Sequence, residues 1–257
     1  MKQLKTTLYL LILATSLSSI QCLAVDAPAE LEWYQRLELS TPVSGIVTQI
    51  KVNTGDAVEK NQLLIKLDDR GFLAQVKRAK SKLTRAIENH AEAKRELERA
   101  QELFDRTAIS VHQHQLVKIE YAKAYAEMNE AQAELAQAQL DLEYSEVRAP
   151  LTGRVVQVFA YPHQTIANRL QVEPLVVIAS TGQMIARANL NASDLKGLKT
   201  GQMLDIKIEN ETLSGKILRL GLEPVGNTRN PAYALDVIFD TAGKTYRKGQ
   251  AASIVLP

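Results

Sequence analysis

Few side chains in this sequence could carry out chemistry, and they form no recognisable set. The four histidines include His90 and the closely spaced His112 and His114, but a metal site needs three or four compatible ligands converging on one point. No nucleophile is paired with a base, no glycine-rich loop could hold a phosphate, and the four methionines do not cluster as soft-metal ligands would. We therefore expect no catalytic residue, no metal site and no cofactor, and the protein is not expected to be an enzyme.

The N-terminus has the pattern of a secretory signal peptide. Lys2 and Lys5 precede an apolar run at 8–13, and small residues lead to Ala24. The run is too short for a bilayer-spanning helix, which needs about 20 apolar residues. Residues 1–24 are thus expected to be removed after Ala24.

The single cysteine and the charge balance exclude several classes of function. Cys22 could be a lipid-attachment site, but Gln21 stands where lipoprotein processing prefers a small residue, so no lipid attachment is expected. Loss of residues 1–24 leaves 31 − 2 = 29 basic against 29 acidic residues and no cysteine. A neutral chain without thiols favours neither nucleic-acid binding nor disulfide chemistry.

The middle of the chain, about 72–144, predicts two long helices. It contains neither glycine nor proline, and its apolar positions recur at alternating steps of three and four, first from Val76 to Phe104 and then from Val117 to Leu142. A weaker stretch at 105–114 separates the arms. We expect an antiparallel coiled-coil hairpin with arms of roughly 45–50 Å, in which His90 interrupts the apolar seam and Ala93 lies in a tight layer.

Similar segments flank this hairpin. The segments 42–52 and 150–160, offset by 108 residues, both read Pro-x-Ser/Thr-Gly followed by alternating β-branched residues. Such alternation after a turn predicts strands, and its repetition predicts two equivalent halves of one small sandwich. His163 stands where the first half has Gly55, so the second turn is expected to be altered.

Beyond about residue 181 the sequence predicts a small β-barrel. Alternating or clustered β-formers separated by glycines are typical of such a fold, and one short helix capped by Asn191 is expected among them. The predicted strands are Met184–Leu190, Met203–Ile208, Leu213–Leu220, Tyr233–Asp240 and Ala251–Leu256.

Three stretches together resemble the membrane fusion protein family, also called HlyD-like periplasmic adaptors. They are 43–68, with Val-Ser-Gly-Ile-Val and Gly-Asp-Ala-Val; 148–155, with Arg-Ala-Pro-Leu-Thr-Gly; and Lys248-Gly249-Gln250 before the last strand. The resemblance implies a mixed α+β fold: a biotinyl/lipoyl-like β-sandwich split by the hairpin and followed by a β-barrel. The implied segments are a signal peptide at 1–24, an N-terminal strand and the first half of the lipoyl-like domain at 25–70, the hairpin at 71–145, the second half at 146–180 and the barrel at 181–257.

The resemblance also implies a function and a binding site. Adaptors of resistance-nodulation-division (RND) pumps carry an Arg-x3-Leu-x6-Ser pattern near the hairpin tip that contacts the outer-membrane channel, and Arg99, Leu103 and Ser110 have this spacing. The expected protein is a periplasmic adaptor of a tripartite efflux system, peripherally associated with the inner membrane. Its expected partners are an RND-type transporter, a TolC-like outer-membrane channel and further copies of itself in a ring.

Two other functions stay open at this point. An adaptor of an ABC-type exporter or secretion system would have the same parts, although many begin with a transmembrane helix. A biotinyl or lipoyl carrier would present an acceptor lysine on the hairpin between the two halves, which is here replaced by the coiled coil. Little sequence precedes the first half-motif or follows the last strand, so we expect the membrane-proximal domain of many family members to be missing or rudimentary.

Overall fold

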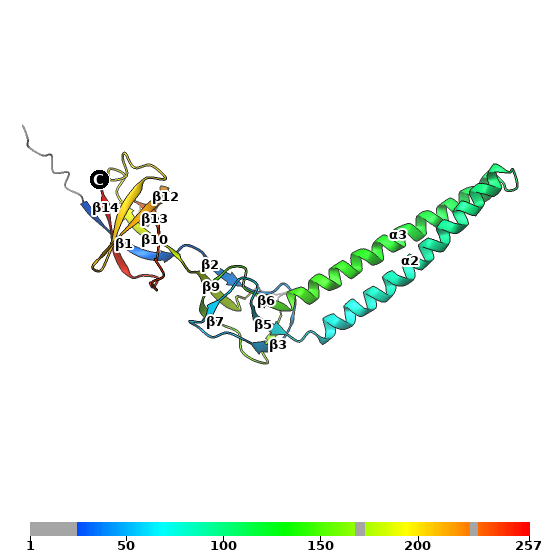
Figure 1. Cartoon of the computed structure of the whole chain (residues 1–257), viewed down its shortest axis with the longest axis horizontal. Helices are drawn as coiled ribbons and strands as arrows, with labels where there is room; N and C mark the ends of the chain where they lie inside the picture. The colour runs from blue at the N-terminus through cyan, green and yellow to red at the C-terminus, as the bar shows by residue number, and fades with distance from the viewer. Residues whose placement is uncertain (1–24, 168–172, 227–230) are drawn as a thin grey trace, which may run out of the picture. The chain divides into compact units, whose positions relative to one another are not determined.

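The computed structural model describes residues 25–167, 173–226 and 231–257, so the expected signal peptide and Cys22 lie outside the described residues. The chain forms two compact units. One comprises Gln35–Thr181, and the other combines the described residues 25–34 with Gly182–Pro257. The first contains the hairpin and the sandwich, and the second contains the barrel (Figure 1).

Helices α2 (Arg70–Asp105) and α3 (Val111–Tyr144) lie side by side as the predicted antiparallel hairpin (Figure 1). The turn between them covers only 106–110, shorter than the expected 105–114. The difference arises because Ser110 caps α3 and starts the helix early.

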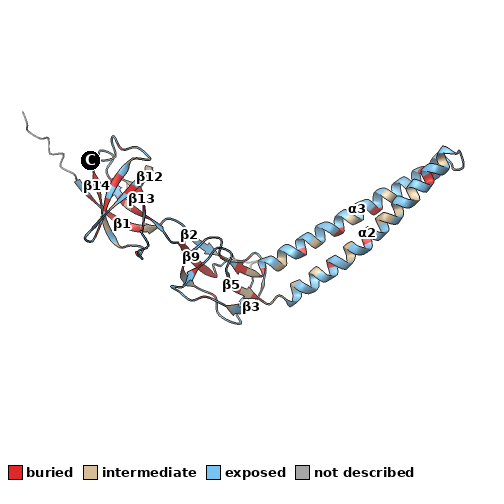
Figure 2. Cartoon of the chain, in the orientation of Figure 1, coloured by how far each residue is buried: buried red, intermediate tan, exposed pale blue. Residues whose placement is uncertain are grey.

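The buried positions of the hairpin, red in Figure 2, are mostly alanines. An alanine at the helix contact lets the two backbones approach, while the larger residues between the alanines fill the adjacent spaces. Ala93 departs from the expected tight layer because it is only half-buried. The buried alanines are Ala79, Ala86, Ala100, Ala124, Ala131 and Ala138.

The sandwich consists of two four-stranded sheets, ordered β2-β9-β7-β4 and β6-β5-β3-β8. Each half of the sequence contributes strands to both sheets, because β4 pairs with β7 and β3 pairs with β8. The bounds are β2 Arg36–Leu39, β3 Gly45–Ile50, β4 Ala57–Val58, β5 Leu63–Leu67, β6 Glu146–Arg148, β7 Gly153–Val158, β8 Thr165–Ile166 and β9 Val176–Ser180.

Hydrogen bonds repeat between the two halves at the offset of 108 residues seen in the sequence. The Gly55 N–H donates to the Val155 carbonyl at 2.8 Å, and the His163 N–H donates to the Val47 carbonyl at 2.8 Å. His163 has φ 66° and Gly55 has φ 96°, so both residues are left-handed. The expectation of an altered second turn is therefore wrong, because His163 takes up the backbone conformation that glycine adopts more easily.

The glycine of the Arg-Ala-Pro-Leu-Thr-Gly stretch lies against a neighbouring strand. A Cβ atom on Gly153 would lie 2.1 Å from the carbonyl oxygen of Ala179. At the equivalent position of the first half, a Cβ on Gly45 would lie 3.2 Å from a terminal methyl of Leu67. Only the second half-motif thus needs glycine for close backbone approach.

The second unit is a closed antiparallel barrel with strand order β1-β10-β13-β12-β11-β14. Its strands are β1 Val25–Trp33, β10 Gln183–Leu190, β11 Met203–Ile208, β12 Glu211–Val225, β13 Ala232–Asp240 and β14 Ala251–Leu256. Leu31, Ile206, Leu235 and Ile254 are fully buried in its core.

Two features of the barrel differ from the sequence analysis. Strand β1 lies between β10 and β14, so the N-terminal strand belongs to the barrel and not to the sandwich with which it was grouped. No helix starts at Asn191; consecutive turns cover this stretch, and Gly197 has φ 89°. Leu195 and Leu198 nevertheless pack against the core, so burial of these side chains holds the stretch together with separate turn hydrogen bonds, such as that from the Asp194 N–H to the Asn191 carbonyl at 3.0 Å.

Candidate functional site

The hairpin tip is closed by a C-terminal cap on α2. Thr107 has φ 60°, its N–H donates to the Phe104 carbonyl, and the Ala108 N–H donates to the Leu103 carbonyl, both at 2.8 Å. This is the Schellman arrangement, which satisfies carbonyls that the end of a helix leaves free. The tip is thereby a defined turn with its own hydrogen bonds.

Ser110 forms the N-cap of α3. Its hydroxyl accepts from the Gln113 N–H at 3.2 Å, while the Gln113 side-chain oxygen accepts from the Ser110 N–H at 3.0 Å. This reciprocal pair is a capping box. Ser110, expected either to cap the second arm or to donate to the channel, caps α3, and its contact with a channel stays a prediction.

Arg99 and Leu103 lie on α2, one turn apart and on the same face. The Arg99 Nη1 donates to Glu96 at 2.9 Å in an exposed ion pair, and Leu103 is 38% exposed. Further apolar side chains are exposed on α3 near the tip: Val111, Leu116 and Ile119. The end of the hairpin therefore combines a guanidinium with apolar surface that the protein itself does not cover.

The histidines extend the seam of the coiled coil. His114, the last residue of the stretch expected to separate the arms, is buried in the first turn of α3 and stacks on Phe104 with ring centroids 4.7 Å apart. His90 contacts two rings of the opposite helix, with centroids 5.2 Å from Tyr121 and 5.5 Å from Tyr125. Sequence reasoning missed His114 because the seam count began at Val117, although His114 continues the same spacing three residues earlier.

No metal site is found in the part of the chain that the structure describes. Within 25–167, 173–226 and 231–257, no three histidine, cysteine, aspartate or glutamate side chains are grouped as ligands. The same residues include no helix long and apolar enough to cross a bilayer.

Charged side chains join the base of the hairpin to the sandwich. Lys66 contacts Asp69 at 2.8 Å and Glu146 at 3.5 Å, linking the start of α2 to β6. The hydrogen bonds that Arg70 donates lower the pKa of Asp68 to about 2. Because α3 runs into β6 with no connecting loop, both arms are held where they meet the sandwich.

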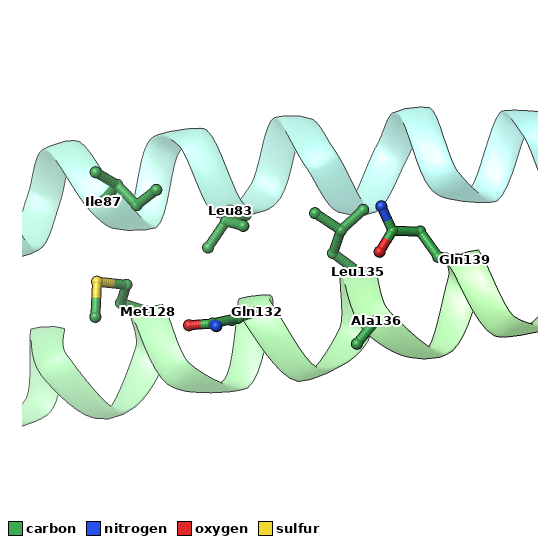
Figure 3. A pocket seen from close by; sticks show the side chains of 7 residues that line it. All are labelled: Leu83, Ile87, Met128, Gln132, Leu135, Ala136 and Gln139. Carbon is green, nitrogen blue, oxygen red and sulfur yellow. The ribbon is translucent and has the colours of Figure 1, made fainter.

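A shallow apolar groove runs along one side of the hairpin (Figure 3). Its volume is about 460 Å³, and Ile87 on its wall is 45% exposed. Side chains from both helices line it, among them Leu83, Met128, Gln132 and Leu135. These residues make the groove a second uncovered surface besides the tip.

Comparison with known proteins gives the family. Residues 35–179, more than half of the chain, match the family described as "RND MFP, barrel-sandwich hybrid domain". The chain belongs to the membrane fusion protein family. This is a family of adaptors and not of enzymes, and the match covers both the sandwich and the hairpin of this membrane fusion protein.

Individual relatives agree with this assignment. The "Macrolide export protein MacA" of Escherichia coli O157:H7 is 29% identical over 70% of this chain and 52% of its own length. The "Antibiotic efflux pump periplasmic linker protein ArpA" of Pseudomonas putida is 26% identical over 70% of this chain and 46% of its own length. This membrane fusion protein thus spans about half the length of these relatives.

A solved structure shares the fold across both units. The "membrane fusion protein Spr0693" of Streptococcus pneumoniae R6 covers 91% of this chain and 99% of its own, with a TM-score of 0.69 and 18% identity. At that identity the similarity concerns the fold alone. The mixed α+β fold class inferred from the sequence is confirmed.

Proposed function

We propose that this membrane fusion protein is the periplasmic adaptor of a tripartite efflux system, associated with the inner membrane and joining an RND-type transporter to an outer-membrane channel. The observation that carries the proposal is the hairpin tip, where Arg99 and Leu103 share one exposed face beside a capped turn. The names of the relatives, which concern export and efflux, support it.

The Arg99 guanidinium can turn from Glu96 to a partner at a small cost in free energy. An exposed ion pair such as Arg99–Glu96 contributes only about 0–1 kcal/mol, so the guanidinium is available to other acceptors. Carbonyls at a helix end or carboxylates on the channel could accept from its fork of donors. Leu103, one turn away, would supply apolar contact from the same face.

The decisive experiment replaces Arg99 by Asp and, to separate charge reversal from loss of donors, by Gln. We expect both variants to be exported and helical, and we expect Arg99→Asp to abolish pump-dependent resistance, because an interface arginine contributes several hydrogen bonds at once. Arg85, also on α2 but far from the tip, provides the matched control. Crosslinking from position 103 should capture the outer-membrane channel. Normal resistance in Arg99→Asp together with no captured channel would refute the proposed docking.

Ser110 needs a variant that keeps its structural role. Ser110→Ala removes the cap and should cost about 0.5–2 kcal/mol of stability irrespective of any partner. Ser110→Asn retains a neutral capping oxygen, so a loss of resistance in this variant with unchanged helix content would indicate that the partner contacts the hydroxyl itself. Comparing resistance with helix content in the two variants separates capping from docking.

The class of the transporter is a more specific claim than the adaptor role itself. The family description that contains RND supports an RND-type transporter, and an ABC-type exporter is the alternative. Affinity purification of the full chain after crosslinking in membranes, followed by mass spectrometry, would identify the partner. Capture of an ABC-type exporter would overturn the RND assignment and leave the adaptor role intact.

We also propose that copies of the chain assemble in a ring, and the apolar groove of Figure 3 offers a surface for a neighbouring hairpin. Ile87→Glu would place a charge in that groove, whereas Arg78→Glu on the same helix would not. Sedimentation of the two variants tests this: Ile87→Glu should shift the protein to smaller species. Unchanged sedimentation of Ile87→Glu would remove the groove from the assembly surface.

A further inference from the structure

The wall of the barrel carries a recess that the adaptor role does not use. It lies over β10, β12 and β13 within the barrel unit and has a volume of about 540 Å³. Arg187, Arg219 and Asp236 line it together with Thr200 and Gly221. It therefore combines two guanidinium groups with one carboxylate in a single hollow.

The carboxylate orients both arginines. Arg187 donates from Nε to one oxygen of Asp236 at 2.7 Å and from Nη2 to the other at 2.9 Å. Arg219 approaches the second oxygen with Nε at 3.0 Å and Nη2 at 2.7 Å. Among the described residues, the Nη1 atom of neither arginine has a hydrogen-bond acceptor, so both guanidinium groups keep unused donors.

Backbone features build this convergence. Strand β12 shifts register between Ile217 and Arg219, and the bulge brings Arg219 opposite Asp236, which pairs with Arg187 on its other side. Bulges often re-aim a side chain in this way. Gly221 allows β12 to approach β13 closely, since a Cβ there would lie 2.9 Å from the backbone nitrogen of Ala234.

Burial distinguishes this cluster from an ordinary surface ion pair. The side chain of Asp236 is 4% exposed, while those of Arg187 and Arg219 are 39% and 63% exposed. Burial opposes ionisation of Asp236, but hydrogen bonds and charge from the two arginines still hold its pKa below the ordinary value. The ionised, buried carboxylate therefore holds two partly exposed guanidinium groups at the recess.

Two carboxylates of β1 lie close to Arg187 without lining the recess. Glu30 is the register partner of Arg187 across the strand pair. Asp236 first, and Glu32 after it, raise the pKa of the Arg187 guanidinium, and Glu32 is also contacted by Lys248 at 3.0 Å. The recess is therefore distinguished by the unused Nη1 donors of its two arginines and not by an excess of positive charge.

We propose that this recess binds a small oxyanion, a carboxylate or a phosphate group, through Arg187 and Arg219, with Asp236 as the buried group that positions both. Guanidinium donors match the paired oxygens of such groups. Thr200 also lines the hollow, and a threonine hydroxyl can act as a further donor. This site is independent of the proposed docking at the hairpin tip.

The test titrates the purified full-length mature chain with inorganic phosphate and, separately, with glutarate, by calorimetry at constant ionic strength maintained with sodium chloride. We expect saturable binding of at least one of them; binding of phosphate alone or of glutarate alone would identify which oxyanion the site prefers. Arg219→Gln should weaken that binding about tenfold, because it removes a charged donor but leaves Asp236 paired with Arg187.

Two further variants test whether binding depends on this recess or on any surface arginine. Thr200→Leu should weaken binding by narrowing the recess without changing its charge, and it does not disturb the buried carboxylate. Arg36→Gln removes an arginine paired with Glu38 in the sandwich and should leave binding unchanged. Absence of binding by both anions, or equal affinity in Arg219→Gln and the unsubstituted chain, would overturn the proposal.

Discussion

Buried imidazoles are the most unusual residues of the hairpin. The Nε2 atoms of His90 and His114 are buried and have no hydrogen-bond partner among the residues that the structure describes. A buried polar atom without a partner loses its interaction with water and gains nothing in return. Stacking on Phe104 provides His114 with packing but does not satisfy this atom.

Replacement of His114 by phenylalanine should therefore stabilise the hairpin. The new ring would preserve stacking on Phe104 and remove the unsatisfied nitrogen, and we expect a gain of about 1 kcal/mol in the free energy of unfolding. Urea denaturation followed by circular dichroism measures it. His112→Phe, at an exposed neighbouring position, should give no gain, and equal gains in both variants would point to a general effect of added apolar surface.

The two strand glycines at equivalent positions should differ sharply in tolerance. Gly153→Ala forces a methyl group into the backbone of Ala179 and should destabilise the sandwich by about 3 kcal/mol or more, the upper range for overpacking. Gly45→Ala meets only the flexible end of Leu67 and should cost about 1 kcal/mol or less. Thermal unfolding of the two variants provides the comparison, and similar losses would contradict the proposed role of the close backbone contact.

At the scale of elements, the hairpin depends on close contact between two helices and much less on surface charge. The Lys82–Glu134 pair crosses from α2 to α3 at 2.5 Å, but both side chains are about 40% exposed, so it contributes little. The buried alanines set the distance at which α2 and α3 pack. Changes in their volume should therefore outweigh changes in surface charge.

Ala131 offers a direct test because it is fully buried in the seam. Ala131→Leu adds a side chain where no space exists and should cost about 1–3 kcal/mol. Ala126→Leu, on the exposed face of the same helix, should leave stability within about 0.5 kcal/mol. Chemical denaturation of both variants measures these changes in the free energy of unfolding. A tolerated leucine at 131 would mean that the helices separate easily.

At the scale of the whole molecule, the chain builds one unit from segments distant in the sequence. Strand β1 is followed by the sandwich and hairpin before the remaining barrel strands begin at Gln183. Its pairing with β10 and β14 closes the barrel and covers edges that would otherwise expose unpaired backbone groups. The barrel thus depends on nine residues at the far end of the chain.

Leu31→Ala should accordingly weaken the barrel unit and spare the other unit. The side chain is fully buried in the barrel core, and its truncation should cost about 2–5 kcal/mol. Hydrogen exchange with mass spectrometry should show faster exchange in β10 to β14 and unchanged protection in α2, α3 and the sandwich. Faster exchange throughout the chain would instead indicate that the two units unfold together.

The sequence alone determined those features that depend on local periodicity. Heptad spacing located both helices, because burial of one helix face imposes the alternation of three and four residues. Alternation of β-formers located most barrel strands, and the offset of 108 residues revealed the two halves of the sandwich. The spacing of Arg99, Leu103 and Ser110 also came from the sequence, although their contact with a partner stays a prediction.

Tertiary structure alone decided what depends on contacts between distant segments. Local patterns record whether a residue is buried but not which strand will lie beside it, so β1 could be assigned to the barrel only from its pairing with β10 and β14. Likewise, the left-handed conformation of His163 follows from hydrogen bonds to the other half of the sandwich. In the sequence, Asp236 is simply one polar residue of a predicted strand. The bulge before Arg219 and the pairing with Arg187 place it between two arginines. Its burial depends on these neighbours across the sheet, which the sequence pattern does not reveal.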